Sequence, residues 1–124
     1  MTVADGNLRD SFTHPIPIPD LFAGGSGNAN YRVRASRHDD PTLVEIHTLD
    51  TDIFYVTSGT ATFIAGGTGV DMKPTSATEL RGTAINARPI IIAKATLWWF
   101  LPAFPHQFQI IRSPPFLYVE VKVR

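Results

Sequence analysis

Polar and apolar residues alternate along most of the chain after residue 30, the pattern of strands that bury one face. The alternation predicts eight strands, each bounded by turn residues or prolines. These strands are Tyr31–Ala35, Thr42–Thr48, Asp52–Thr57, Ala61–Ala65, Pro89–Ala93, Leu97–Leu101, Gln107–Ile111 and Leu117–Val123. In the last strand the side chains of Leu117, Val119, Val121 and Val123 share one face, and those of Tyr118, Glu120 and Lys122 share the other.

Turn signals separate these strands. Ser58-Gly59-Thr60 predicts a tight hairpin turn, and Gly66-Gly67 ends the strand that follows it. Ser76-Ala77-Thr78-Glu79 fits a helix capping box, but Gly82 follows so soon that we expect a loop with at most one helical turn. The many short strands therefore predict an all-β fold, an antiparallel sandwich or barrel.

The first thirty residues differ from the rest. Pro15, Pro17 and Pro19 stand at alternate positions, which excludes a central strand because each proline removes a donor from the ladder. We expect residues 1–30 to form an extended Pro- and Gly-rich segment that lies along the domain or across a partner subunit. Residues 31–124 are then a single β-domain, and we expect the protein to be a homodimer because a small barrel needs its edge strands covered.

Composition narrows the function. The chain has 124 residues, and its 11 Lys and Arg balance 11 Asp and Glu. This balance argues against binding to nucleic acids and anionic membranes, which select a basic surface. The absence of cysteine excludes disulfides, thiolate metal sites and a cysteine nucleophile. Without a signal-peptide pattern or a membrane-length apolar stretch, we expect a cytoplasmic protein that binds a small molecule.

Two of the four histidines are candidates for chemistry. His14 and His38 stand in polar segments, and we expect both to face solvent. His47 and His106 stand in apolar strands instead. A single histidine on a strand is more often a hydrogen-bonded core residue than a metal ligand. Whether His47 and His106 bind a metal therefore depends on the residues around them.

Carboxylates accompany His47. Glu45 lies two residues before it, so both side chains emerge on the same face of the strand. Asp52 opens the next strand, and an antiparallel neighbour would bring it beside His47. Asp50 is a rival for that role, although a turn-forming aspartate is the simpler interpretation. Two imidazoles with one or two carboxylates suit Fe(II), Mn(II), Ni(II) or Zn(II).

The spacing resembles a known family. In the segment Glu45-Ile-His47-Thr-Leu-Asp-Thr-Asp52-Ile-Phe-Tyr-Val-Thr-Ser-Gly59, three residues match the first motif of the cupins: the second histidine, the acidic residue and the glycine. Leu101-Pro-Ala-Phe-Pro-His106-Gln-Phe108 resembles the second motif. The resemblance covers about Tyr31 to Val123. It implies a double-stranded β-helix, or jelly-roll barrel, with a divalent metal inside.

The resemblance also implies a ligand set and a range of activities. The metal ligands would be Glu45, His47, Asp52 and His106, and the activity that of a metal-dependent dioxygenase, isomerase, decarboxylase or lyase. Glu45 stands where the family usually has its first histidine, so it is a fourth ligand, a catalytic base, or the ion-pair partner of Arg32 or Arg34. Asp52 is shorter than the usual glutamate, which leaves its reach to the metal open.

Aromatic residues surround the second motif. Most belong to a core, but Phe54 shares a strand face with Asp52 and should line the cavity if Asp52 does. We expect a small, apolar ligand pocket with few polar anchors. Its candidate lining residues are Phe54, Phe104, Phe108, Trp98 and Arg34. Arg32 and Arg34 share a face, so they either bind a carboxylate or are solvent-facing charges.

Two departures from the family support a second hypothesis. Phe104 replaces the usual glycine of the second motif, and Glu45 replaces a histidine of the first. A metal-free barrel that binds a small apolar or carboxylate ligand would also account for this sequence.

Overall fold

The computed structural model describes residues 20–22 and 30–124, the first three by their backbone only. Regular structure in this part of the chain consists entirely of strands, so no helix there could cross a membrane. The strands are β1 (Asp20–Phe22), β2 (Tyr31–His38), β3 (Val44–His47), β4 (Thr51–Ser58), β5 (Thr60–Ala65), β6 (Thr68–Ser76), β7 (Glu79–Ile85), β8 (Arg88–Ala93), β9 (Leu97–Phe100), β10 (His106–Ile111) and β11 (Phe116–Val123). Within residues 1–30, the remainder of the predicted extended segment, with His14, lies outside the described residues.

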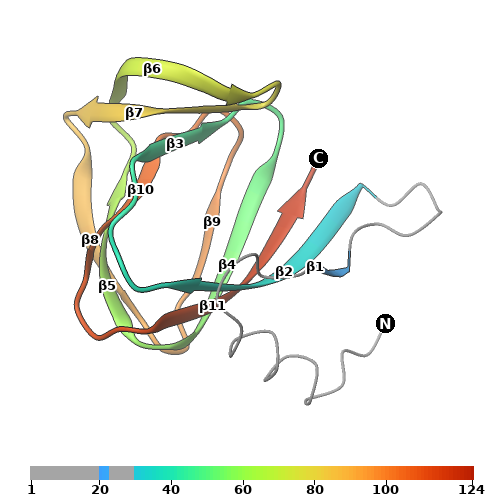
Figure 1. Cartoon of the computed structure of the whole chain (residues 1–124), viewed down its shortest axis with the longest axis vertical. Helices are drawn as coiled ribbons and strands as arrows, with labels where there is room; N and C mark the ends of the chain where they lie inside the picture. The colour runs from blue at the N-terminus through green and yellow to red at the C-terminus, as the bar shows by residue number, and fades with distance from the viewer. Residues whose placement is uncertain (1–19, 23–29) are drawn as a thin grey trace.

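Two antiparallel sheets face each other and enclose a barrel (Figure 1). One sheet has the strand order β1-β2-β11-β4-β9, and the other has the order β6-β7-β3-β10-β5-β8. From β2 to β5, and again from β8 to β11, the chain changes sheet at every connection. The predicted all-β, double-stranded β-helix architecture is confirmed.

Two strands and one turn differ from the sequence-based expectation. The sequence did not indicate β6 and β7, because Pro74 and Gly82 interrupt the alternation there. The loop expected at Ser76–Glu79 is the turn of the β6–β7 hairpin, and it contains no helical turn. Ser58-Gly59-Thr60 is a tight turn but not a hairpin, because β4 and β5 belong to opposite sheets.

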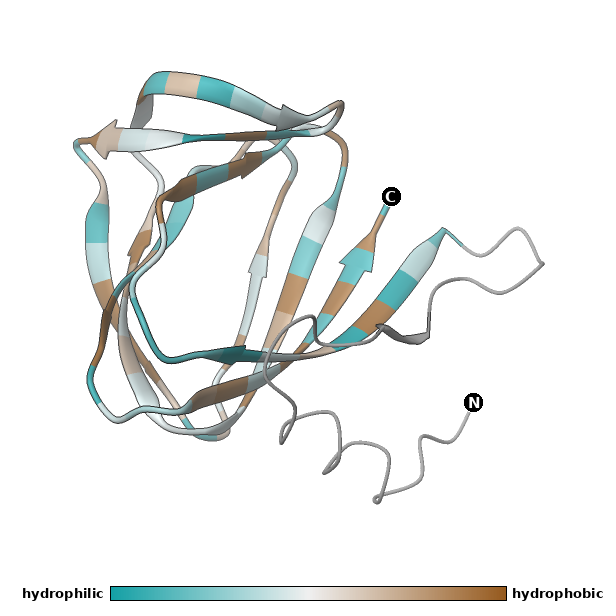
Figure 2. Cartoon of the chain, in the orientation of Figure 1, coloured by the Kyte–Doolittle hydropathy of each residue, from teal (hydrophilic) through white to brown (hydrophobic). Residues whose placement is uncertain are grey.

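The last strand shows which face is buried. Along β11, Phe116, Tyr118, Glu120 and Lys122 are buried, whereas the leucine and the valines between them are partly exposed. Figure 2 shows this alternation as hydrophilic and hydrophobic bands on the strand. The polar residues of β11 therefore point into the barrel, and the valines lie on its outer face.

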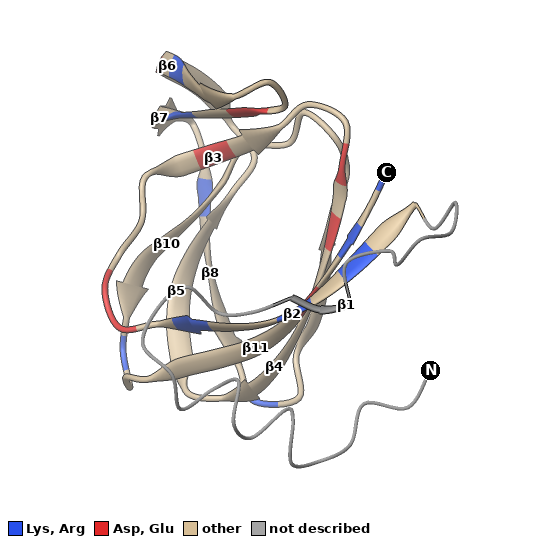
Figure 3. Cartoon of the chain, turned by 45° about the vertical axis from the view of Figure 1, so that its right-hand side comes forward, with Lys and Arg blue, Asp and Glu red and all other residues tan. Residues whose placement is uncertain are grey.

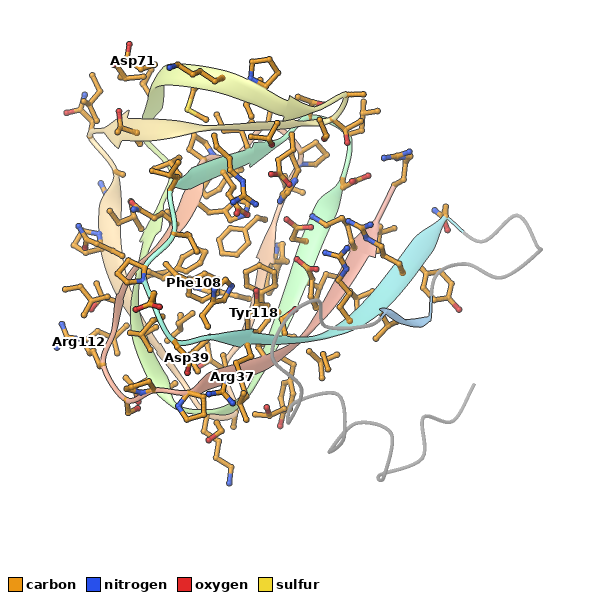
Figure 4. The ribbon with its side chains drawn as sticks, in the orientation of Figure 1. Arg37, Asp39, Asp71, Phe108, Arg112 and Tyr118 are labelled. Atoms are coloured by element: carbon orange, nitrogen blue, oxygen red, sulfur yellow. The ribbon has the colours of Figure 1, made fainter. Side chains whose placement is uncertain are left out.

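The barrel interior has an apolar part and a charged part. The apolar part is a cluster of buried side chains, and Phe108 and Tyr118 can be followed inside the barrel in Figure 4. The members are Phe54, Val56, Ala61, Phe63, Ile92, Phe100, Phe108, Phe116 and Tyr118. The charged part begins at Asp52, two residues before Phe54 on β4. Asp52 is the register partner of Lys122 on β11.

Gly59 is required by the crossover from β4 to β5. Its φ is +86°, and a Cβ there would lie 2.9 Å from the carbonyl oxygens of Pro115 and Ser113. Gly66 also has a positive φ of +76°, but a Cβ there would meet only the Phe104 ring, at 3.4 Å. The two glycines share a backbone conformation and differ in the space around it.

We expect Gly59→Ala to destabilise the fold more than Gly66→Ala in urea unfolding. Both variants place an alanine in the left-handed region, which costs about 1–2 kcal/mol. Only Gly59→Ala also forces a methyl group against backbone atoms, which adds about 1–3 kcal/mol. Equal losses of unfolding free energy in the two variants would show that the close approach is unimportant.

Candidate functional site

Three potential metal ligands converge on the inner face of one sheet. Glu45 and His106 are register partners across the β3–β10 pair, so their side chains emerge side by side. His47 follows Glu45 by two residues and therefore shares its face. One ligand atom from each of Glu45, His47 and His106 can be chosen so that all lie within 4.8 Å of one another. Adjacent strands thus bring together residues from the two motifs.

Asp52 approaches this group from the opposite sheet. Its Oδ2 lies 3.1 Å from Nε2 of His47 and 3.6 Å from Nε2 of His106. The sequence-based expectation of an antiparallel β3–β4 pair is wrong, because β3 and β4 lie in different sheets. Asp52 is nevertheless beside both imidazoles, since the barrel places the two strands face to face.

His106 is held in an orientation suited to ligation. Its Nδ1 lies 3.0 Å from the carbonyl oxygen of Phe104, which fixes Nδ1 as the donor and leaves the lone pair on Nε2. That Nε2 is buried and has no hydrogen-bond partner in the described chain. Burial lowers the pKa of His106, so the ring is neutral at pH 7. A neutral imidazole with an unused, inward-facing Nε2 is a typical metal ligand.

The proline corner before His106 is bonded to the other motif. The backbone N–H of Ala103 donates a 2.7 Å hydrogen bond to the carbonyl oxygen of His47. His106 itself stacks on Phe100, with ring centroids 4.9 Å apart. These contacts hold the two histidine rings at a centroid separation of 5.3 Å.

Lys122 is a member of the site that the sequence did not indicate. Its ammonium lies 2.5 Å from Oδ1 of Asp52, and both side chains are almost completely buried. Glu120, the next inward residue of β11, lies 3.9 Å from the same ammonium. Burial raises the pKa of Glu120. Figure 3 shows acidic positions on β3 and β4 and basic positions on β2 and β11.

Glu45 has a cationic partner from β7. Arg81 approaches Oε1 of Glu45 at 2.8 Å and hydrogen-bonds Oε1 of Glu79 at 2.7 Å. The ion-pair interpretation of Glu45 was therefore correct in kind, but the partner is neither Arg32 nor Arg34. Arg81 holds one oxygen of Glu45, while the other lies 3.7 Å from Nε2 of His47.

Neighbouring charges set the protonation states of Glu45 and His47. Burial would raise the pKa of Glu45, but its contact with His47 and the charge of Arg81 lower it. Burial would lower the pKa of His47, but the carboxylates of Glu45 and Asp52 raise it. Glu45 is therefore ionised at pH 7, as a metal ligand must be.

A cavity of about 350 Å³ opens beside the site. It is lined mostly by polar and charged side chains, so the expectation of an apolar pocket is wrong for this cavity. Its lining residues include Arg32, Arg34, Ser36, His38, Glu45, His47, Arg81 and Tyr118. A second cavity, of about 470 Å³, shares Arg32, His47, Glu79 and Lys122 with the first.

Most of the aromatic residues proposed from the sequence belong to the core or pack against it. Phe54 and Phe108 belong to the buried core cluster, and Trp98 packs against it. Phe104 stacks on Phe100 and is 38% exposed. None of these four lines either cavity, whereas Arg34 lines the smaller one, with Nη1 3.8 Å from Glu120.

One minor expectation, for His38, needs correction, and another, for Asp50, gains a contact. His38 does not lie in a solvent-facing turn: it ends β2, and its Nε2 is 3.1 Å from the hydroxyl of Tyr118. The sequence offered no signal for this contact, because the two residues are 80 positions apart. Asp50 is buried and pairs with Nε of Arg124 at 3.0 Å, which adds an ion pair to its predicted turn.

The comparisons with known proteins support the fold. No protein-family model and no curated protein matches the sequence. Hydroquinone 1,2-dioxygenase from Sphingomonas sp. TTNP3 matches with a TM-score of 0.65 and 10% identity over 94% of this chain and 72% of that one. An uncharacterized protein with a double-stranded β-helix domain from Klebsiella pneumoniae matches with a TM-score of 0.60 and 15% identity over 92% and 80%.

A variant of oxalate decarboxylase from Bacillus subtilis also matches, with a TM-score of 0.55 and 13% identity. The match covers 77% of this chain but only 22% of the decarboxylase. At such identities these similarities establish a shared fold, the double-stranded β-helix that the cupin resemblance implied.

The Lys122–Asp52 pair generates a stability prediction for metal-free protein. Lys122→Met leaves the Asp52 carboxylate buried without a counter-charge, so we expect a loss of about 3–5 kcal/mol in unfolding free energy. The double variant Lys122→Met, Asp52→Asn removes both charges and should recover most of this loss. Urea unfolding measures both. A small loss in Lys122→Met, or no recovery in the double variant, would contradict a tightly coupled pair.

Proposed function

We propose that this protein is a metal-dependent enzyme that acts on a small molecule bound inside the barrel. The metal is a divalent ion of Fe, Mn, Ni or Zn, and its ligands are Glu45, His47 and His106. One observation carries the proposal: these donors converge within 4.8 Å, and the buried Nε2 of His106 lacks any partner in the described chain. Two histidines and one carboxylate with open positions are typical of non-haem iron sites and also suit the other ions.

Asp52 has a secondary place in this proposal. Its Oδ2 contacts both imidazoles, so it is near enough to serve as a fourth ligand. The ammonium of Lys122 at 2.5 Å holds its other oxygen. This restraint leaves Oδ2 as the atom of Asp52 that a metal could share with the two imidazoles. Glu45, with Arg81 on one oxygen, keeps the other for the metal or for a proton of the substrate.

The surrounding residues bind and position the substrate. A divalent ion would supply Lewis acidity or a site for O₂. Arg34 reaches the cavity directly and would contact a substrate. Phe54, Phe104, Phe108 and Trp98 would form the apolar wall behind the ligands. The dioxygenase and the decarboxylase that share the fold are named for different reactions, so the fold does not select one.

The alternative is a metal-free barrel that binds a small ligand. Its support is the pairing of charges already present: Lys122 with Asp52, and Arg81 with both Glu45 and Glu79. A site whose charges neutralise one another is stable without an ion. In that case a chelator should change neither the melting temperature nor ligand binding.

Metal analysis of protein purified without a chelating tag tests the main proposal. We expect about one divalent ion per chain, and its loss in His106→Ala because one imidazole is removed. His38→Ala is the matched control, since His38 lines the same cavity but lies outside the ligand group. Loss of bound metal should also lower the melting temperature of the wild type. Normal metal content in His106→Ala would exclude this ligand set.

We also propose that the protein is a homodimer that uses the outer face of the β1-β2-β11-β4-β9 sheet. Tyr55, Leu97 and Trp99 lie on this face and are 48%, 55% and 62% exposed. The inward residues of the same strands, such as Phe54 and Phe100, are buried. An exposed group of large apolar side chains marks an interaction surface.

Light scattering after size exclusion tests the dimer. We expect a dimer for the wild type and a monomer for Trp99→Asp, because the charge would be buried in the interface. Ile91→Asp is the control, since Ile91 is 66% exposed on β8 of the other sheet. A monomeric wild type, or dissociation of both variants, would contradict this interface.

A further inference from the structure

Arg32 stands apart from the other cations of the cavity. Its Nε is buried and has no hydrogen-bond partner, and no acidic group of the described residues lies within 4 Å of its guanidinium. By contrast, Lys122 pairs with Asp52, and Arg81 pairs with Glu45 and Glu79. A buried donor without an acceptor is unfavourable by about 1–3 kcal/mol, so such groups in native structures usually have a ligand, an ion or a water as partner.

The position of Arg32 suggests which partner. Arg32 lines both cavities, together with His47, Glu79 and Lys122, and therefore lies where the two cavities meet beside the candidate metal ligands. Arg34 follows two residues later on β2, so the two guanidinium groups share a face. In the register of the sheet, Arg32 is paired with Lys122, and Arg34 with Glu120. A ligand in the cavity would have guanidinium groups on one wall and the metal ligands on another.

The charges around the site indicate the sign of the ligand. Apart from Arg37, the cavity and the ligand group contain four cations and four carboxylates, and a histidine that ligates a metal is neutral. These are Arg32, Arg34, Arg81 and Lys122, against Glu45, Glu79, Glu120 and Asp52. Arg37, which also reaches the cavity, is paired with Asp39. A divalent ion added to this balanced set leaves two uncompensated positive charges in a partly buried place, where an anion would neutralise them.

We propose that the ligand of this cavity is a small carboxylic acid, whose carboxylate is bound by Arg32 with Arg34 beside it. The planar guanidinium of arginine matches the two oxygens of a carboxylate, and such charge-assisted pairs are among the strongest hydrogen bonds in proteins. The rest of the acid extends toward Glu45, His47 and His106. This assignment rests on the proposed metal-dependent function and specifies its substrate class.

Calorimetric titration of the full chain tests the assignment, with metal content measured on every sample. The probes are acetate, succinate and benzoate, each against its neutral amide. At least one acid should bind while its amide does not. Arg32→Gln should weaken that binding by about tenfold or more, because a charge-assisted contact is lost. Arg112→Gln is the matched control, because Arg112 bonds Thr62 on the outside of the barrel (Figure 4) and should leave binding unchanged.

The outcomes separate the two proposals. If metal is bound but no acid binds, or if Arg32→Gln binds every acid as the wild type does, the carboxylate assignment is overturned and the metal site stands. An acid and its amide binding equally would also overturn it, and would leave water as the partner of Arg32. If the chain holds no metal yet binds an acid through Arg32, the assignment survives and the metal-dependent function fails.

Discussion

The buried ion pair between Lys122 and Asp52 is the constraint on which the charged half of the barrel depends. Each side chain is at most 5% exposed, and the contact joins neighbouring strands of one sheet. A carboxylate in such a place is tolerated only with a counter-charge and further polar contacts. Lys122 supplies the charge, and the imidazole of His47 lies 3.1 Å from the other carboxylate oxygen. The pair therefore permits a polar centre inside a small β-barrel.

The apolar half of the interior complements this centre. His106 lies at the boundary: its ring stacks on Phe100 and Phe63, while its Nε2 points toward Asp52. Aromatic packing thereby fixes a ligand atom that no hydrogen bond of the described chain restrains. The carbonyl of Phe104 fixes the tautomer from the other side of the ring. Rigid strands and packed rings fix the positions of the side chains at the site, as a metal coordination shell requires.

Much of this arrangement was predictable from local spacing. Glu45 and His47 share a face because they are two residues apart on a strand, and that inference needed no tertiary information. The proline corner before His106 was visible as well. The contacts missed were those set by the barrel, such as His38 with Tyr118, or Arg81 with Glu45. The buried face of β11 was also set by the barrel and not by local pattern. A strand with valines on one face is normally expected to bury them, but β11 buries the other face.

X-ray absorption at the metal edge of protein loaded with Fe(II), Mn(II), Ni(II) or Zn(II) tests the central claim most directly. The account predicts two imidazole ligands together with oxygen ligands in the wild type, and no imidazole-bound metal in His106→Ala, which loses the site. A shell of oxygen atoms without imidazole, unchanged by that substitution, would contradict the claim that His47 and His106 hold a metal inside this barrel.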